Sequence, residues 1–123
     1  MVFVDTNILV DLFASDEQVV LRASLQLANS KKPLIISDAV LTEFCGLLLH
    51  NQRFLVPRPT VDLILQGLLS RKEFLFGGKG QEAIQLFTKH PKLDMVDCLV
   101  ACYGNCKARL VLTNDSNLQK VLT

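Results

Sequence analysis

This 123-residue sequence has neither a strong charge imbalance nor a long apolar run. Its formal net charge is +1, too small for a nucleic-acid binder that relies on bulk electrostatics. No apolar stretch approaches the roughly 18 residues of a membrane span, and the opening lacks the basic region of a signal peptide. With 50% apolar and 20% charged residues, the sequence predicts one globular domain over residues 1–123 without membrane association.

The cysteines lack the patterns of a zinc site, a disulfide framework or a nucleophile. There are four of them: Cys45, Cys98, Cys102 and Cys106. There is no C-x-x-C pair with a His partner, as structural zinc requires, and no His is paired by pattern with a cysteine as a base. The last three recur every fourth residue, which predicts one packed helix face. Free thiols without a leader sequence favour the cytoplasm.

Strand and helix signals alternate along the chain. Short apolar runs predict strands at residues 3–4, 34–36, 74–76 and 110–112, while apolar residues at helical spacing predict helices between them and at the C-terminus. We expect Thr60 to cap the helix after Pro57-Arg58-Pro59. Alternation of this kind implies right-handed crossovers and a central parallel sheet. The segment Gly77–Gly80 follows a strand, but it does not match a P-loop.

Four carboxylates lie at or near strand-to-helix junctions: Asp5, Glu43, Asp97 and Asp115. Ligands of open α/β sheets bind beyond the carboxyl ends of the strands, and all four can reach that edge. Oxygen-only ligands favour hard cations, Mg²⁺ or Mn²⁺. A metal held in this way can activate water and neutralise the charge of a phosphodiester.

Three of the four carboxylates also fit an ordinary structural interpretation well. Asp5 is suited to cap a helix, Glu43 to face solvent, and Asp115 to form a turn in Asn-Asp-Ser. Asp97 is the exception, because an apolar helix start is an unusual place for a solvated charge. Asp94 precedes it by three residues and is expected to be a cap that shares its face.

The basic residues are concentrated in the middle of the chain. Residues 53–92 carry seven Lys or Arg against three acids. From this segment, Arg53, Arg58 and Lys79 are candidates for contacts with an RNA backbone. An ordinary solvated face is the alternative.

Four short segments together resemble the motifs of PIN-domain nucleases. They are Val4-Asp5-Thr6-Asn7, Val40-Leu41-Thr42-Glu43-Phe44, Asp94-Met95-Val96-Asp97 and Leu112-Thr113-Asn114-Asp115, in the family's order. The resemblance extends from residue 2 to about residue 120. Members commonly continue into a further short strand, whereas this sequence stops at Thr123.

The resemblance implies a three-layer α/β/α fold and a Mg²⁺- or Mn²⁺-dependent ribonuclease, often a VapC-type toxin paired with a small antitoxin protein and usually a homodimer. By carry-over, Asp5, Glu43, Asp97 and Asp115 are the catalytic, metal-binding acids. Asn7 and Thr113 orient them through hydrogen bonds, and Asp94 lies beside them.

Three other functions compete with that of a toxin. An RNA-processing nuclease that is not a toxin and a non-catalytic PIN-fold binding module both fit the same motifs. A receiver-type signalling domain also places acids at strand ends, but it needs a Lys after a late strand. None follows Leu110-Val111-Leu112, which argues against that class.

Overall fold

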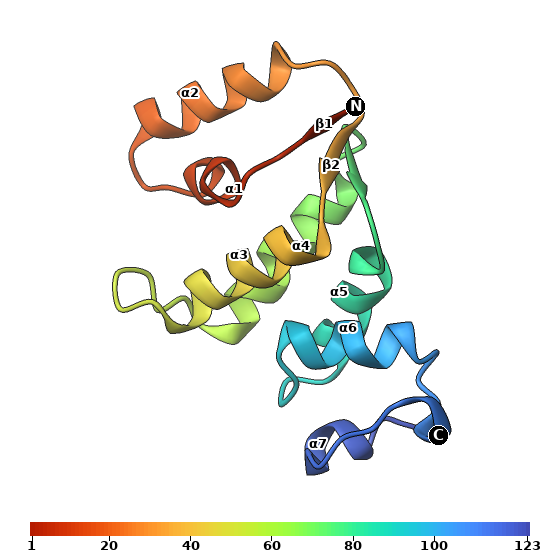
Figure 1. Cartoon of the computed structure of the whole chain (residues 1–123). Helices are drawn as coiled ribbons and strands as arrows, with labels where there is room; N and C mark the ends of the chain where they lie inside the picture. Colours follow the sequence, from red (N-terminus) through yellow and green to blue (C-terminus); the bar gives the residue numbers. More distant parts are fainter.

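The computed structural model describes residues 1–123 and consists of a small parallel sheet with helices around it (Figure 1). In chain order the elements are β1 (Val2–Phe3), α1 (Thr6–Leu12), α2 (Glu17–Ala28), β2 (Leu34–Ile36), α3 (Asp38–His50), α4 (Arg58–Ser70), β3 (Phe74–Phe76), α5 (Gly80–Lys89), α6 (Met95–Tyr103), the 3₁₀ turn η1 (Ala108–Leu110) and α7 (Ser116–Gln119). Seven α-helices and a three-strand parallel sheet confirm the predicted α/β class and are consistent with a three-layer α/β/α fold.

The sheet has the order β1-β2-β3, so that β2 is central and β1 and β3 are edges. Both pairings are parallel, and α1 with α2 and α3 with α4 form the two crossovers. Parallel strands direct their carboxyl ends to one edge of a sheet, where ligands bind in open α/β folds. The segments that begin α1 and α3 therefore share this edge.

One face of the sheet is only partly covered. Phe3, Ile35 and Leu75 lie side by side in the register. Ile35 is buried, but Phe3 is 66% and Leu75 52% exposed. The neighbouring rows contain Leu34 and Ile36, both fully buried. The helices therefore cover one face of the sheet more completely than the other.

The hydrophobic core surrounds α3, whose apolar stripe is buried along its whole length. Phe44 and Phe87 are the largest side chains with no exposed surface, and they anchor α3 and α5 in one cluster of 24 buried residues. Helix α3 contacts α1 on one side and α6 on the other. It is the scaffold between the N-terminal and C-terminal parts of the chain.

Three helices begin at capping side chains, one of which, Asp94, the sequence predicts. The side chains of Asp16, Ser37 and Asp94 each accept a hydrogen bond from a backbone N–H in the first turn of α2, α3 and α6. Such side chains satisfy the N–H groups that have no partner within a helix. Asp94 is thus confirmed as a cap.

The expectation that Thr60 caps α4 was wrong. This helix begins two residues earlier, at Arg58, with Pro57 before it and Pro59 inside its first turn. Proline lacks the N–H that would be unpaired there, and its fixed φ suits a first turn. The two prolines therefore start this helix, and Thr60 is its third residue.

The predicted strand at residues 110–112 does not form. Ala108–Leu110 is a 3₁₀ turn, and the residues after it are extended but pair with no strand. Val111 packs against Gly104, where a Cβ would collide with its methyl group. Leu118 is buried, and this packing holds the segment against α6. Figure 1 shows the C-terminal residues below α6, at the opposite end of the molecule from the N-terminus.

The expectation of one cysteine-bearing helix was also partly wrong. Cys98 and Cys102 lie on α6, but the helix ends at Tyr103 and Cys106 lies beyond it with a φ of 55°. Asn105 and Cys106 both have positive φ, a conformation outside the right-handed helical region, so the helix cannot continue through them. All four thiols are free, and burial raises the pKa of Cys45 and of Cys98 to about 12, which makes both poor nucleophiles. No helix is long and apolar enough to cross a membrane.

Candidate active site

Asp5 lies where β1 gives way to α1. It is the cap of α1, and its Oδ1 accepts a hydrogen bond from the backbone N–H of Thr6 over 2.7 Å. Thr6 is buried, whereas Asp5 and Asn7 are exposed. The second carboxylate oxygen of Asp5 is therefore available beyond the carboxyl end of the first strand.

Asp97 lies in the first turn of α6, three residues after Asp94, which caps this helix. The Asp94 carboxylate accepts from the Asp97 backbone N–H over 2.8 Å. Partial burial raises the pKa of the Asp97 carboxyl, and the negative charge of Asp94, a hydrogen bond to its carboxylate and the charge of Asp115 raise it further. Asp94, Asp97 and Asp115 therefore share one negative region.

Asp115 is the cap of the short C-terminal helix α7. Its Oδ1 accepts from the Leu118 N–H over 2.9 Å, and its own N–H donates to the Thr113 hydroxyl over 3.0 Å. Thr113 thereby fixes the turn that presents Asp115.

Glu43 lies on α3, the helix after β2, and is exposed, whereas Phe44 and Cys45 directly after it are buried. Its neighbour Thr42 is half-buried and lines two hollows between α3 and α6. The larger hollow has a volume of about 600 Å³. Glu43 therefore lies near the border between the N-terminal and C-terminal parts of the fold.

The four carboxylates do not form one metal site in a single chain. No group of three or more His, Cys, Asp or Glu side chains is placed to hold one ion. Figure 1 shows the start of α1 and the start of α6 on opposite sides of α3. The donor chemistry suits a hard cation, but the placement within one chain does not fit a common ion.

The hollow between α3 and α6 contains a polar junction that the sequence does not reveal. The Tyr103 hydroxyl donates to Oδ2 of Asp38, and the backbone N–H of Lys79 donates to Oδ1 over 3.2 Å. The hydrogen bond to Asp38 raises the pKa of Tyr103. The glycine-rich loop before α5 therefore binds the carboxylate of Asp38. A Cβ on Gly78 would collide with this carboxylate and with the Tyr103 hydroxyl.

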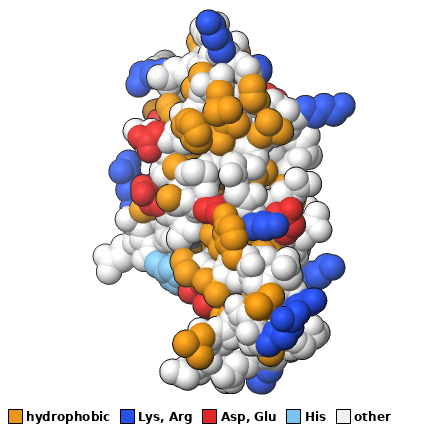
Figure 2. All heavy atoms as spheres, turned by 45° about the vertical axis from the view of Figure 1, so that its right-hand side comes forward, with side chains coloured by type: hydrophobic (Ala, Val, Ile, Leu, Met, Phe, Trp, Pro, Cys, Tyr) orange, Lys and Arg blue, Asp and Glu red, His pale blue; other side chains and the backbone are white.

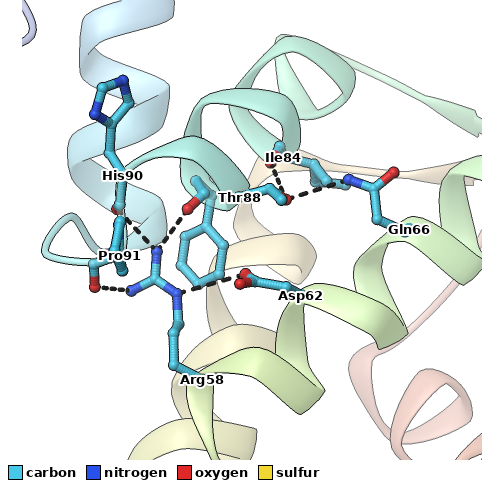
Figure 3. A network of polar contacts seen from close by, with 8 residues as sticks. Arg58, Asp62, Gln66, Ile84, Thr88, His90 and Pro91 are labelled. Carbon is cyan, nitrogen blue, oxygen red and sulfur yellow. Dashed lines mark hydrogen bonds and ion pairs between the residues drawn. The ribbon is translucent and has the colours of Figure 1, made fainter.

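Of the three basic candidates, Arg58 is engaged inside the protein (Figure 3). Its guanidinium donates to the carbonyl oxygens of Pro91, Phe87 and His90 over 2.8, 2.8 and 3.2 Å. It also lies 3.3 Å from the centre of the Phe87 ring and 3.6 Å from the Asp62 carboxylate. The two Nη groups are thus committed to carbonyl oxygens at the end of α5 and just after it, and the buried Nε faces Asp62 without a hydrogen bond, so the guanidinium is not free for a phosphate.

The other two basic candidates lie closer to the surface. Arg53 is exposed, 5.7 Å from the centre of the Phe54 ring, and lines a hollow of about 560 Å³ beside the turn between α1 and α2. Lys79 is half-buried just before α5. Both remain open to contact with a polyanion.

The PIN-domain family model matches residues 2–122, almost the whole chain. This chain therefore belongs to the PIN domain family. PIN domains are generally nucleases that use divalent metals, which supports a hydrolase acting on nucleic acids. No curated protein and no solved structure matches the chain.

Proposed function

We propose that this protein is a metal-dependent endoribonuclease. The observation that carries the proposal is that a PIN-domain match over residues 2–122 includes an acid in each of the four motifs. Asp5, Glu43, Asp97 and Asp115 would supply oxygen donors to Mg²⁺ or Mn²⁺. Such an ion, when bound, activates water and neutralises phosphodiester charge.

The proposal is tested by cleavage of a panel of RNAs with Mg²⁺ or Mn²⁺ and with EDTA. We expect Asp5→Asn and Asp97→Asn to lower the cleavage rate by more than about 100-fold, because loss of partners outside the ligand shell already costs about 10–100-fold. Asn is as good a cap of α1 as Asp5 is, and Asp97 is not the cap of α6, so the folds of both variants should persist by circular dichroism.

Asp16→Asn is the matched control. Asp16 caps α2 just as Asp5 caps α1, but it lies outside the acid set. We expect this variant to cleave as the wild type does. Full activity of Asp97→Asn, or undiminished activity in EDTA, would contradict the proposal.

The biological role that we propose is that of the toxin of a VapBC-type pair, with a small antitoxin protein as partner and a homodimer as the working form. Expression of the wild type should arrest growth, whereas expression of Asp5→Asn should not. RNA cleavage in vitro without growth arrest would favour an RNA-processing nuclease instead.

A non-catalytic binding module is the second candidate, and one observation favours it. No three carboxylates of a single chain are grouped to hold an ion. Mn²⁺ binding without cleavage of any RNA in the panel would support this function.

A further inference from the structure

The hollow at the end of α1 is formed by three segments that are distant in sequence. They are the end of α1 with the turn after it, the start of α2, and the loop between α3 and α4. Figure 1 shows this turn and this loop on the same side of the molecule. The volume of about 560 Å³ lies within the range of about 300–1,000 Å³ that is typical of small-molecule sites. The hollow is therefore large enough for a single nucleotide.

Two phenylalanine rings line this hollow. Phe13 is 39% exposed, and its ring centre lies 6.1 Å from that of Phe44, which is fully buried. Phe54 is half-buried on the other side. Single-stranded RNA is typically bound by stacking of its bases on such aromatic rings. The Phe13 ring, held from behind by the core, offers a rigid stacking surface.

Arg53 lies in the same hollow with its charge unpaired. Its guanidinium is 5.7 Å from the centre of the Phe54 ring, and neither ion pair of the structure includes it. The loop around it is fixed, because the Arg53 N–H donates to the Asn51 side chain over 2.9 Å and the Val56 N–H donates to the Leu48 carbonyl over 2.7 Å. Arginine binds phosphate oxygens with two parallel donors, so Arg53 is suited to the phosphate of a nucleotide.

The third functional group of the hollow is the carboxylate of Asp11. Asp11 is half-buried and takes part in neither ion pair. Asp16, also at the hollow, differs because it is exposed and its carboxylate holds the Gln18 N–H over 2.9 Å as the cap of α2. A carboxylate has two acceptor oxygens and no donor. A ligand that satisfies Asp11 must therefore bring two neighbouring donors.

Among the four RNA bases, guanine has this pattern. Its Watson–Crick edge presents two adjacent donors, the N1–H and the amino group on C2. Adenine and cytosine each place an amino group beside a ring nitrogen that accepts, and uracil places its N–H between two carbonyl oxygens. Proteins read unstacked RNA bases by hydrogen bonds to this edge. A carboxylate thus favours guanine and repels the acceptors of the other three bases.

We propose that this hollow binds a guanine nucleotide of single-stranded RNA. The base stacks on Phe13, its two donors bind Asp11, and a phosphate lies against Arg53. The inference rests on the proposed ribonuclease function and adds to it the base that is selected. Asp5 and Asp11 lie at the two ends of α1, about 9 Å apart along the helix axis, so RNA held in this hollow passes close to a candidate catalytic acid.

The other exposed apolar surfaces lack this combination of groups. Figure 2 shows apolar side chains gathered at the height of the strands and again at the height of α6 and the C-terminal segment. The hollow beside Phe3 has about 220 Å³, which is below the range of ligand sites. In the hollow beside α6, both oxygens of Asp38 are already bound, by Tyr103 and by the Lys79 N–H. Neither hollow is lined by an arginine or a lysine.

The first test is a titration of the full chain in EDTA with GMP, IMP and AMP, followed by amide NMR. We expect GMP to bind about tenfold more tightly than AMP, as for a bidentate contact with a base. IMP lacks the amino group on C2 and should bind more weakly than GMP. The largest shifts should fall on Asp11, Phe13 and Arg53. Equal affinities for GMP and AMP, or shifts confined to other residues, would overturn the inference.

Three variants assign the contacts. Asp11→Asn should bind GMP no more tightly than AMP, because an amide offers one acceptor oxygen where the carboxylate offers two. Asp16→Asn is the matched control, since it removes the same charge from the same hollow and should keep the preference for GMP. Arg53→Gln should weaken GMP and AMP by the same factor and leave guanosine, which has no phosphate, unchanged. An Asp11→Asn variant that keeps the preference would contradict the proposal.

The second test measures cleavage of RNA oligonucleotides that contain one guanine, with inosine at that position in the matched set. The wild type should cut the guanine set at a fixed distance from the base and cut the inosine set more slowly. Asp11→Asn should cut both sets at the same rate. Binding of GMP without cleavage of any RNA would refute only the nuclease proposal. Cleavage of both sets at equal rates by the wild type would refute only the guanine site.

Discussion

At the scale of single residues, the acids that mark the candidate site are also helix caps. Asp5 and Asp115 each hold the first turn of a helix with one carboxylate oxygen. The capping and the functional interpretations of these residues are therefore compatible, because one oxygen caps and the other is free. Because the capping hydrogen bond holds one carboxylate oxygen of each residue, it also fixes the position of the other, free oxygen.

Asp97 differs from the two caps because its environment opposes its charge. Burial, the Asp94 charge and the Asp115 charge raise its pKa above the ordinary 3.8. In the pH range just above that value the folded state binds more protons than the unfolded state. The unfolding free energy therefore falls as pH rises through this range, and at neutral pH the Asp97 carboxylate lowers stability.

We predict that Asp97→Asn unfolds at a higher urea concentration than the wild type at pH 7.5. Removal of the charge relieves the repulsion, while the Asn amide can still donate to Asp94. The difference should shrink near pH 3, where the Asp97 carboxyl is mostly protonated in both states. Urea titrations at the two pH values measure this effect. Glu17→Gln is the control, because Glu17 also lies in a first helical turn but is exposed. A less stable Asp97→Asn at pH 7.5 would refute the prediction.

Asp38 and Arg58 have structural roles that no local sequence pattern predicts. Asp38 binds Tyr103 and the backbone of Lys79 across 65 and 41 residues of sequence. Arg58 binds carbonyl oxygens that follow it by 29 to 33 residues. Such partners are neighbours only after folding, so sequence reasoning placed Arg58 among candidates for RNA contact.

At the scale of elements, the buried strands were the predictable part. Leu34–Ile36 and Phe74–Phe76 have apolar or β-branched runs and find partners on β1 and β2. Residues 110–112 have an equally apolar run, but strand formation depends on a partner and on packing as well as on propensity. In this structure residues 110–112 have no partner strand. The helix start at Arg58 was also missed, because the prolines around it were interpreted only as helix breakers.

The start of α4 and the end of α5 are joined through Arg58, so we predict that Arg58→Ala lowers the unfolding free energy by about 2 kcal/mol. Three carbonyl oxygens, one at the surface and two partly buried, would lose a charged donor, and a hydrogen bond to a charged group contributes about 1.5–3 kcal/mol. Arg58→Lys should recover little, because an ammonium cannot reproduce the planar fork. Urea unfolding provides the measurement.

Arg53→Ala is the matched control for this prediction. Arg53 is exposed and has only a distant contact with the Phe54 ring, so its loss should change stability by less than about 0.5 kcal/mol. Equal losses for the two alanine variants would contradict the role that the network in Figure 3 assigns to Arg58.

At the scale of the whole molecule, the family and the fold class were predictable while the arrangement of the site was not. The order of the four motifs identifies a PIN domain, and residues 2–122 match that family. The motifs do not encode whether Asp5 and Asp115 meet within one chain. That depends on where residues 104–123 pack, and in this structure Leu118 and Val111 hold them against α6.

The short edges of the sheet have a consequence for aggregation. An edge strand presents unpaired N–H and C=O groups on which other chains can pair. Here the edge strands β1 and β3 have two and three residues, and very short edge strands are one way in which proteins limit such pairing. The sheet should therefore resist edge-to-edge aggregation, even though Phe3 and Leu75 are exposed on its edge strands.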